Sequence, residues 1–287
     1  MLLQHLFNGL LAWTYYTLVA FGFYFASVGC RHFNFTTGFG YLLGPYIVLF
    51  FLLHQLWPVG IGISLLGCAG MGALYHSLSA WLSKKGLREG QLLIVSLGIM
   101  AAGQNGLAFI FGSTSQALWP FNAVDAFYQY RSLVITKQQF ISIVVGGGLI
   151  VALLLVWRKS LLGLALRGLL ESRLNLMLRG YNVDALEKII SSVGFLLVGV
   201  AGILWASDSR VRPSMALDAS LIGIVTFIVG PILVEGLWGL LFVSFAIALV
   251  KVLFTLFLQG DWAMTVPLIV FLAALLVYRG KLVLRVS

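Results

Sequence analysis

Charged residues are scarce in this chain, since only 9% of its 287 residues are Asp, Glu, Lys or Arg. Soluble domains carry about a quarter charged residues, so the scarcity excludes a soluble globular protein. Hydrophobic residues make up 61% of the chain and form runs close to the roughly 20 residues that a bilayer-crossing helix needs. The short alternating segments of a transmembrane β-barrel are missing. The composition therefore predicts an all-α polytopic membrane protein, with residues 1–287 forming a single transmembrane domain.

Cysteine and histidine are also few. The two cysteines, Cys30 and Cys68, are too isolated for a disulfide framework or a metal site, and the four histidines lack metal-ligand spacing. The sequence contains no phosphate-binding loop of the pattern GxxxxGK[ST]. It also offers no Ser/His or paired-Asp constellation typical of a membrane enzyme. We therefore expect the chain to bind no cofactor or metal itself and to hydrolyse no ATP.

Acidic residues are half as common as basic ones, 9 against 18, which gives a net charge of +9. Twelve of the basic residues lie in three segments, 84–88, 158–188 and 279–285. Lys and Arg in short loops stay on the cytoplasmic side of a membrane protein, so these segments are expected inside. The positive charge thus indicates topology, and we expect no nucleic-acid partner.

Nine apolar segments are long enough to predict membrane helices, and the last one begins after residue 260. Their number falls to eight if 40–57 or 219–234 is a broken or re-entrant segment. With three helices before the inner loop at 83–90, the N-terminus is expected outside. The predicted helices are 6–28, 40–57, 59–82, 91–111, 138–157, 189–206, 219–234, 236–258 and 262–279.

The longest inner segment, 158–188, alternates leucines with charged residues at helical spacing. It predicts a short helix along the cytoplasmic face, ended by Gly180 as a C-cap, with Asn182 or Asp184 starting the next helix. Two interpretations remain open. The segment is an interfacial helix resting on lipid, or it is a docking helix for a cytoplasmic partner.

The stretch RHFNFTTG, residues 31–38, places polar residues between two long apolar segments. Irregular polar backbone at membrane depth must line a cavity or be buried in protein. Asn34 or the hydroxyls of Thr36 and Thr37 suit the cap of a half-helix whose N-terminus attracts a carboxylate, and Gly38 permits close approach. The alternative is an ordinary turn between two membrane helices.

Three further polar residues lie inside apolar segments. The adjacent amides Gln104 and Asn105 either bond to neighbouring helices or line a substrate pathway. A carboxylate such as Glu235 costs free energy inside the membrane and indicates a functional residue by default. Pairing with Lys251 is a structural alternative. Together with Asn34, Phe35, Thr36, Thr37 and Gly38, these three residues form the predicted substrate pathway.

A set of residues and short stretches, spread in order over about residues 7–213, carries a resemblance to a known family: Phe7-Asn8-Gly9, Tyr15-Tyr16, Asn34-Phe35, Gly38, Gly98, Gln104-Asn105, Gly163, Ala165, Arg167, Glu171, Gly180, Asn182, Asp184, Val200-Ala201-Gly202 and Pro213. Together they resemble the shorter permease subunit of branched-chain amino acid ABC importers. Two departures stand out: Thr36-Thr37 replaces the family's Ala-His, and the glycine-rich run after residue 220 is reduced to Gly230, Gly236 and Gly239, with Glu235 inserted.

The resemblance implies a subunit of an ATP-driven importer in the bacterial inner membrane. Such a subunit pairs with a second permease and with two cytoplasmic ATPases that bind ATP and Mg, and receives substrate from an external binding protein. The expected substrate is a branched-chain or other small amino acid. Urea, short amides or another small solute are alternatives, as is an ATP-independent carrier or channel. The residues implied in ATPase coupling are Arg167, Glu171, Arg173, Arg179, Gly180, Asn182 and Asp184.

Overall fold

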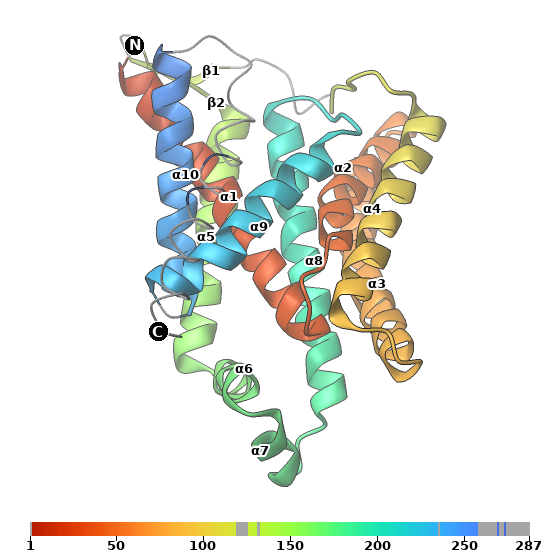
Figure 1. The fold of residues 1–287 in the computed structure, drawn as a ribbon. Coiled ribbons are helices and arrows are strands. Elements are labelled where there is room, and N and C mark those ends of the chain that lie inside the picture. Colours follow the sequence, from red (N-terminus) through yellow and green to blue (C-terminus); the bar gives the residue numbers. More distant parts are fainter. Residues whose placement is uncertain are drawn as a thin grey trace.

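The computed structural model describes residues 2–118, 126–130, 133–234 and 236–257, with the isolated residues 269 and 273. Within these ranges the protein is a bundle of helices (Figure 1), apart from one antiparallel hairpin of strands β1 (Ala126–Tyr130) and β2 (Leu133–Thr136). The helices are α1 (Leu2–Cys30), α2 (Thr36–Leu53), α3 (Trp57–Lys84), α4 (Glu89–Phe111), α5 (Lys137–Lys159), α6 (Leu161–Glu171), α7 (Arg173–Leu178), α8 (Val183–Asp208), α9 (Met215–Leu233) and α10 (Leu237–Phe257).

Six of these helices, α1 to α5 and α8, are long and apolar enough to cross a membrane. This confirms the predicted polytopic all-α fold. Of the two segments considered for a break, 40–57 belongs to a full-length candidate span, Thr36–Leu53. The segment 219–234 belongs to a shorter apolar helix, Met215–Pro231, which is followed by another, Leu237–Leu253. The predicted helix 262–279 lies outside the described residues.

The basic loops gather at one end of the bundle. The α3–α4 turn, which follows Lys84, and the helices α6 and α7 lie at the end away from the N-terminus (Figure 1). Helix α5 also carries Arg158 and Lys159 in its last turn at this end. Because basic loops stay cytoplasmic, we call this the inner end. The start of α1 and the β1–β2 hairpin then lie at the outer end.

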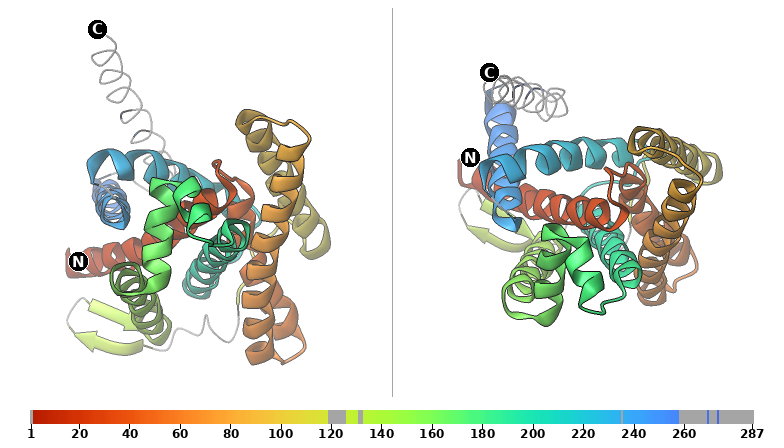
Figure 2. Two further views of the ribbon diagram at one scale, coloured as in Figure 1. Left: turned by 90° about the horizontal axis from the view of Figure 1, so that it is seen from below. Right: turned by 60° about the horizontal axis from the view of Figure 1, so that its bottom comes forward.

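Helices α1 and α8 form the centre of the bundle, and α8 also packs on α2 and α3 (Figure 2). Glycines allow α1 and α8 to touch along their backbones. A Cβ atom added to Gly194 of α8 would lie 2.5 Å from the Ala26 nitrogen and 2.6 Å from the Gly22 carbonyl oxygen of α1. Helices in lipid associate through close packing at small residues, so these glycines fix the central pair that orients both cavities described below.

Candidate functional site

The polar stretch 31–38 forms the junction between α1 and α2. Arg31 has a φ of +64°, in the left-handed region that non-glycine residues rarely adopt, and the chain turns there after α1. The Asn34 side-chain oxygen accepts a hydrogen bond from the Thr36 backbone N–H at 2.9 Å. Thr36 Oγ1 donates to the Ser96 carbonyl at 3.1 Å, and the Phe35 N–H donates to Ser96 Oγ at 3.1 Å. The junction is thereby fastened to α4.

The second half of this junction is packed among helices. Asn34, Thr36 and Thr37 are fully buried. A Cβ atom on Gly38 would overlap Ser220 Oγ and lie 2.8 Å from the Ala216 carbonyl oxygen, both on α9. The junction therefore joins α1 and α2 to α4 and α9, and the part that reaches an open cavity is Cys30 to His32. Its role in a substrate pathway stays a prediction.

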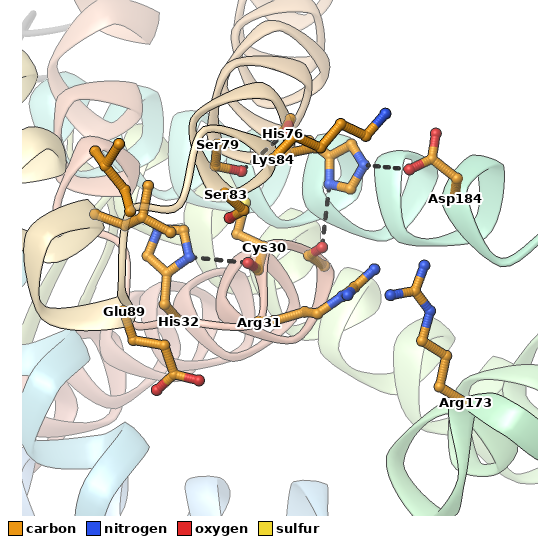
Figure 3. A pocket seen from close by; sticks show the side chains of 14 residues that line it. Cys30, Arg31, His32, His76, Ser79, Ser83, Lys84, Glu89, Arg173 and Asp184 are labelled. Atoms are coloured by element: carbon orange, nitrogen blue, oxygen red, sulfur yellow. Dashed lines mark hydrogen bonds and ion pairs between the residues drawn. The ribbon is translucent and has the colours of Figure 1, made fainter.

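A cavity of about 440 Å³ opens at the inner end, where α1, α3, α4, α7 and α8 meet (Figure 3). Its walls are rich in ionisable side chains that come from distant parts of the sequence. Arg31, Lys84 and Arg173 carry positive charge and Glu89 and Asp184 carry negative charge, so both signs meet in this cavity. The ionisable lining residues are Cys30, Arg31, His32, His76, Lys84, Glu89, Arg173 and Asp184.

Beside this cavity one buried carboxylate joins three helices. The Glu187 side chain on α8 is only 2% exposed. Arg31, at the end of α1, donates to it twice, from Nε to Oε1 at 2.9 Å and from Nη2 to Oε2 at 2.6 Å. Arg173 of α7 brings its Nε within 3.6 Å of Oε1, and Figure 3 shows the two guanidinium groups pointing toward one another. Glu187 thus links the predicted coupling segment to the α1–α2 junction.

Two histidines, His32 and His76, also line this cavity. His76 Nδ1 donates to the Gly29 carbonyl at 3.1 Å, and its Nε2 lies 3.6 Å from Asp184 Oδ1. His32 Nδ1 donates to the Cys30 carbonyl at 2.8 Å, so its Nε2 accepts from the Tyr75 hydroxyl at 3.0 Å in the neutral form. Burial lowers the pKa of His32, while the Cys30 hydrogen bond and Glu89 act in the opposite direction. His32 is therefore neutral at pH 7.

Metal binding at the inner cavity is disfavoured by charge. His76, Asp184 and Glu187 hold ligand atoms within 4.8 Å of one another. However, both Glu187 oxygens are already bonded to Arg31, and Arg173 lies against the same carboxylate. A divalent cation would have to displace or face these guanidinium groups, so we assign no metal here.

The predicted coupling segment consists of α6, α7 and the first turn of α8. Gly180, in the turn that follows α7, has a φ of +80°, and the Asn182 side chain accepts from the Ala185 N–H at 3.1 Å to cap α8. The Asn182 cap is confirmed, whereas the C-cap of α7 is Arg179, one residue before the predicted Gly180. The single helix expected before Gly180 is wrong: Ser172 is extended, at φ −162° and ψ 110°, and its Oγ accepts from the Asn175 N–H at 3.3 Å to start α7 separately.

The remaining coupling residues are distributed over this segment. Arg167 donates from Nε to the Gly163 carbonyl of its own helix at 3.3 Å, Glu171 is the last residue of α6, and Arg179 is the C-cap of α7. Arg173 points inward to Glu187, and Asp184 faces the inner cavity. The same segment also carries exposed apolar side chains: Leu161, Leu164, Leu170, Leu174, Met177, Leu178 and Tyr181.

The two amides of α4 lie on a sparsely covered helix. Only 11% of the α4 span is buried within the described chain. Asn105 is exposed and donates from Nδ2 to the Ala101 carbonyl of its own helix at 3.0 Å. Its bonding to a neighbouring helix and its place in a substrate pathway stay predictions. Gln104 is half-buried. Glu235 lies outside the described residues, and its predicted role stays a prediction.

Glu187 was missed in the sequence because the membrane helix was expected to begin only at 189. Helix α8 begins at Val183. Extending the helix back to the Asn182 cap puts Glu187 on the same face as Val183, Ile190 and Gly194, all of which are buried. That helical spacing was the available signal for a buried carboxylate.

Comparisons with known proteins match most of the chain. The family model described as branched-chain amino acid transport system / permease component matches residues 5–275. Two similar curated proteins are the high-affinity branched-chain amino acid transport system permease proteins LivH of Salmonella typhimurium and of Salmonella typhi. Each is 29% identical over 219 residues, which cover 70% of this chain and 70% of the relative.

Proposed function

Because the chain belongs to the family of permease components of branched-chain amino acid transport systems, we propose that it is the membrane-spanning subunit of an ATP-driven ABC importer. The multi-pass fold and the family define a transport subunit. The proposed location is the bacterial inner membrane, and the proposed cargo is a branched-chain or another small amino acid, as the names of the LivH relatives suggest.

The observation that carries this proposal is the pair α6–α7. These helices lie below the transmembrane bundle, with α7 farthest from it (Figure 1). The apolar side chains of Leu161 and Leu178 are 84% and 77% exposed at the inner end, so the rest of this chain does not cover them. An amphipathic helix of this kind suits a hydrophobic groove on another protein, and we assign that groove to an ABC ATPase.

The ATPases supply what this chain lacks. With no phosphate-binding loop in its sequence, the permease depends on two cytoplasmic partners that bind ATP and Mg and hydrolyse ATP. A second, related permease is the proposed neighbour of α4, because amides such as Gln104 and Asn105 are unfavourable against lipid and favourable against protein. The outer end, with the start of α1 and the β1–β2 hairpin, would receive the substrate-binding protein.

The geometry suggests how ATPase movement reaches the membrane. Closure of the ATPase dimer would displace α7, which contacts Glu187 through Arg173. Glu187 holds Arg31 at the end of α1, and the junction that follows is bonded to Ser96 of α4. A shift of α7 would thus be transmitted to α1, α2 and α4 together, as switching between two packed arrangements requires.

Reconstitution tests the proposed function. The chain is co-purified with its second permease and ATPases, placed in liposomes and supplied with the binding protein and labelled leucine. We expect uptake that requires ATP and stops when the ATPases carry a substitution of the phosphate-loop lysine. Excess isoleucine or valine should compete, whereas urea and acetamide should not. Uptake that persists without ATP would instead identify an ATP-independent carrier or channel.

A further inference from the structure

A second cavity, of about 380 Å³, lies at the outer end of the bundle between α1, α5, α8 and α10. It is separate from the inner cavity, since the two share no lining residue. Four of its lining residues are apolar: Leu11, Ala12, Trp205 and Val252. The other lining residues are polar or charged: His5, Asn8, Tyr15, Gln139, Asp208 and Lys251.

Lys251 is the only charged residue of α10. Its Nζ lies 5.4 Å from the centroid of the Tyr16 ring, within cation–π range. Within the described ranges it forms no ion pair at 4.0 Å or less. An ammonium group on an otherwise apolar membrane helix is energetically costly and marks a functional site by default.

Asp208 supplies the opposite charge to the same cavity. It is the last residue of α8, its side chain is exposed, and it also has no ion-pair partner within 4.0 Å in the described part of the chain. The neighbouring carboxylate, Asp218, differs because Arg212 Nη2 donates to it at 3.1 Å. Among the described residues, the outer cavity therefore presents a carboxylate from α8, beside Gln139, and an ammonium from α10, each without an ion pair within 4.0 Å. Lys251 also lines the small cavity that contains Asp218.

We propose that this outer cavity is a binding site of the permease for a zwitterionic α-amino acid. The ligand's ammonium faces Asp208, its carboxylate faces Lys251, and its side chain packs on Leu11, Ala12 and Trp205. A ligand with an ammonium and a carboxylate on one carbon complements both Asp208 and Lys251. A neutral amide, a simple cation or a simple anion leaves at least one of these two side chains without an opposite charge. The site would select zwitterionic α-amino acids as the substrate class of the importer, and this inference rests on the proposed function.

A smaller cavity indicates the route by which the ligand would leave the outer cavity toward the bundle interior. It measures about 60 Å³, shares Trp205 and Lys251 with the outer cavity, and reaches Tyr41 of α2. Trp205 and Lys251 thus stand between the outer site and the bundle interior. A bound carboxylate at Lys251 would lie at the entrance of this inward route.

The test measures leucine binding to the complex in nanodiscs without the binding protein, by saturation-transfer NMR. Two analogues compete: 4-methylpentanoate, which lacks the ammonium, and 3-methylbutylamine, which lacks the carboxylate. We expect neither analogue to compete well with leucine on the wild type. Asp208→Asn should weaken leucine binding at least about tenfold, while 4-methylpentanoate should bind as well as before or more tightly. Lys251→Met should also weaken leucine binding about tenfold, while 3-methylbutylamine should bind as well as before.

The matched control is Lys137→Met, which removes a positive charge from the first residue of α5 at the outer end and does not line the cavity. It should bind leucine as the wild type does. A misfolded variant would lose all ligands alike, so the reciprocal pattern reports the site itself. Equal effects on both analogues, or none on leucine, would overturn the inference. If wild-type uptake of leucine proved independent of ATP, the proposed function would fail instead.

Discussion

Gly180→Val lowers ATP-driven uptake to less than about a tenth of the wild-type rate, while ATP hydrolysis continues. Gly180 has a φ of +80°, a conformation that is strained for a β-branched residue by roughly 1–3 kcal/mol. The turn relaxes by changing the direction of α7 relative to α8. Since α7 carries Arg173, the contact with Glu187 is then lost, and movement of the ATPases no longer reaches the α1–α2 junction.

Gly86→Val is the matched control for this prediction. Gly86 lies in the inner turn between α3 and α4 with a φ of +92°, and at both glycines a Cβ atom would meet nothing within 4 Å. The two substitutions therefore introduce similar backbone strain without steric overlap, but only one falls in the coupling segment. Uptake and ATP hydrolysis are measured in the same proteoliposomes. Equal uptake by the two variants, whether high or low, would contradict the coupling role of the α7–α8 turn.

Arg31→Met destabilises the protein more than Glu187→Gln does. The Glu187 side chain is 2% exposed and the Arg31 side chain 52%. Removing the arginine leaves a buried carboxylate with Arg173 as its remaining cation, and breaking a buried ion pair costs about 3–5 kcal/mol. Removing the carboxylate leaves Arg31 able to return to water, so the loss is smaller.

Thermal unfolding of the two single variants and the double variant in one detergent checks this asymmetry. The double variant Arg31→Met/Glu187→Gln should be more stable than Arg31→Met alone, because it no longer buries a carboxylate that has lost its two hydrogen bonds from Arg31. If the stability losses of the two single variants simply add up in the double variant, the Arg31–Glu187 contact contributes no interaction energy. In that case the link from α7 to α1 would lose its physical basis.

The sequence predicted most helices closely, because long apolar segments and their caps are local signals. Helix α4 was expected at 91–111 and spans Glu89–Phe111, and the Asn182 cap was anticipated. The break at Ser172 was not, since nothing in the leucine spacing distinguishes one helix from two. The sequence was therefore sufficient to predict those helices whose positions depend on local apolar pattern and capping residues.

The sites were harder to predict because each needs residues that are distant in the chain. The inner cluster joins Arg31 to Glu187, 156 residues apart, and the α1–α2 junction is bonded to Ser96, 60 residues beyond Thr36. In the sequence, Lys251 was considered only as a structural partner of Glu235. The cavity that it shares with Asp208 follows from the packing of α8 and α10 on α1, which a single sequence does not specify.

The most direct test of the central claim is purification of the native complex from its own membrane in mild detergent, with quantitative mass spectrometry. The account predicts this chain with a second permease and two ABC ATPases. It also predicts that charged substitutions at Leu174 and Leu178, on the exposed face of α7, release the ATPases while the permease pair stays intact. Recovery of the wild-type chain alone or as a homodimer, without an ATPase, would contradict the account.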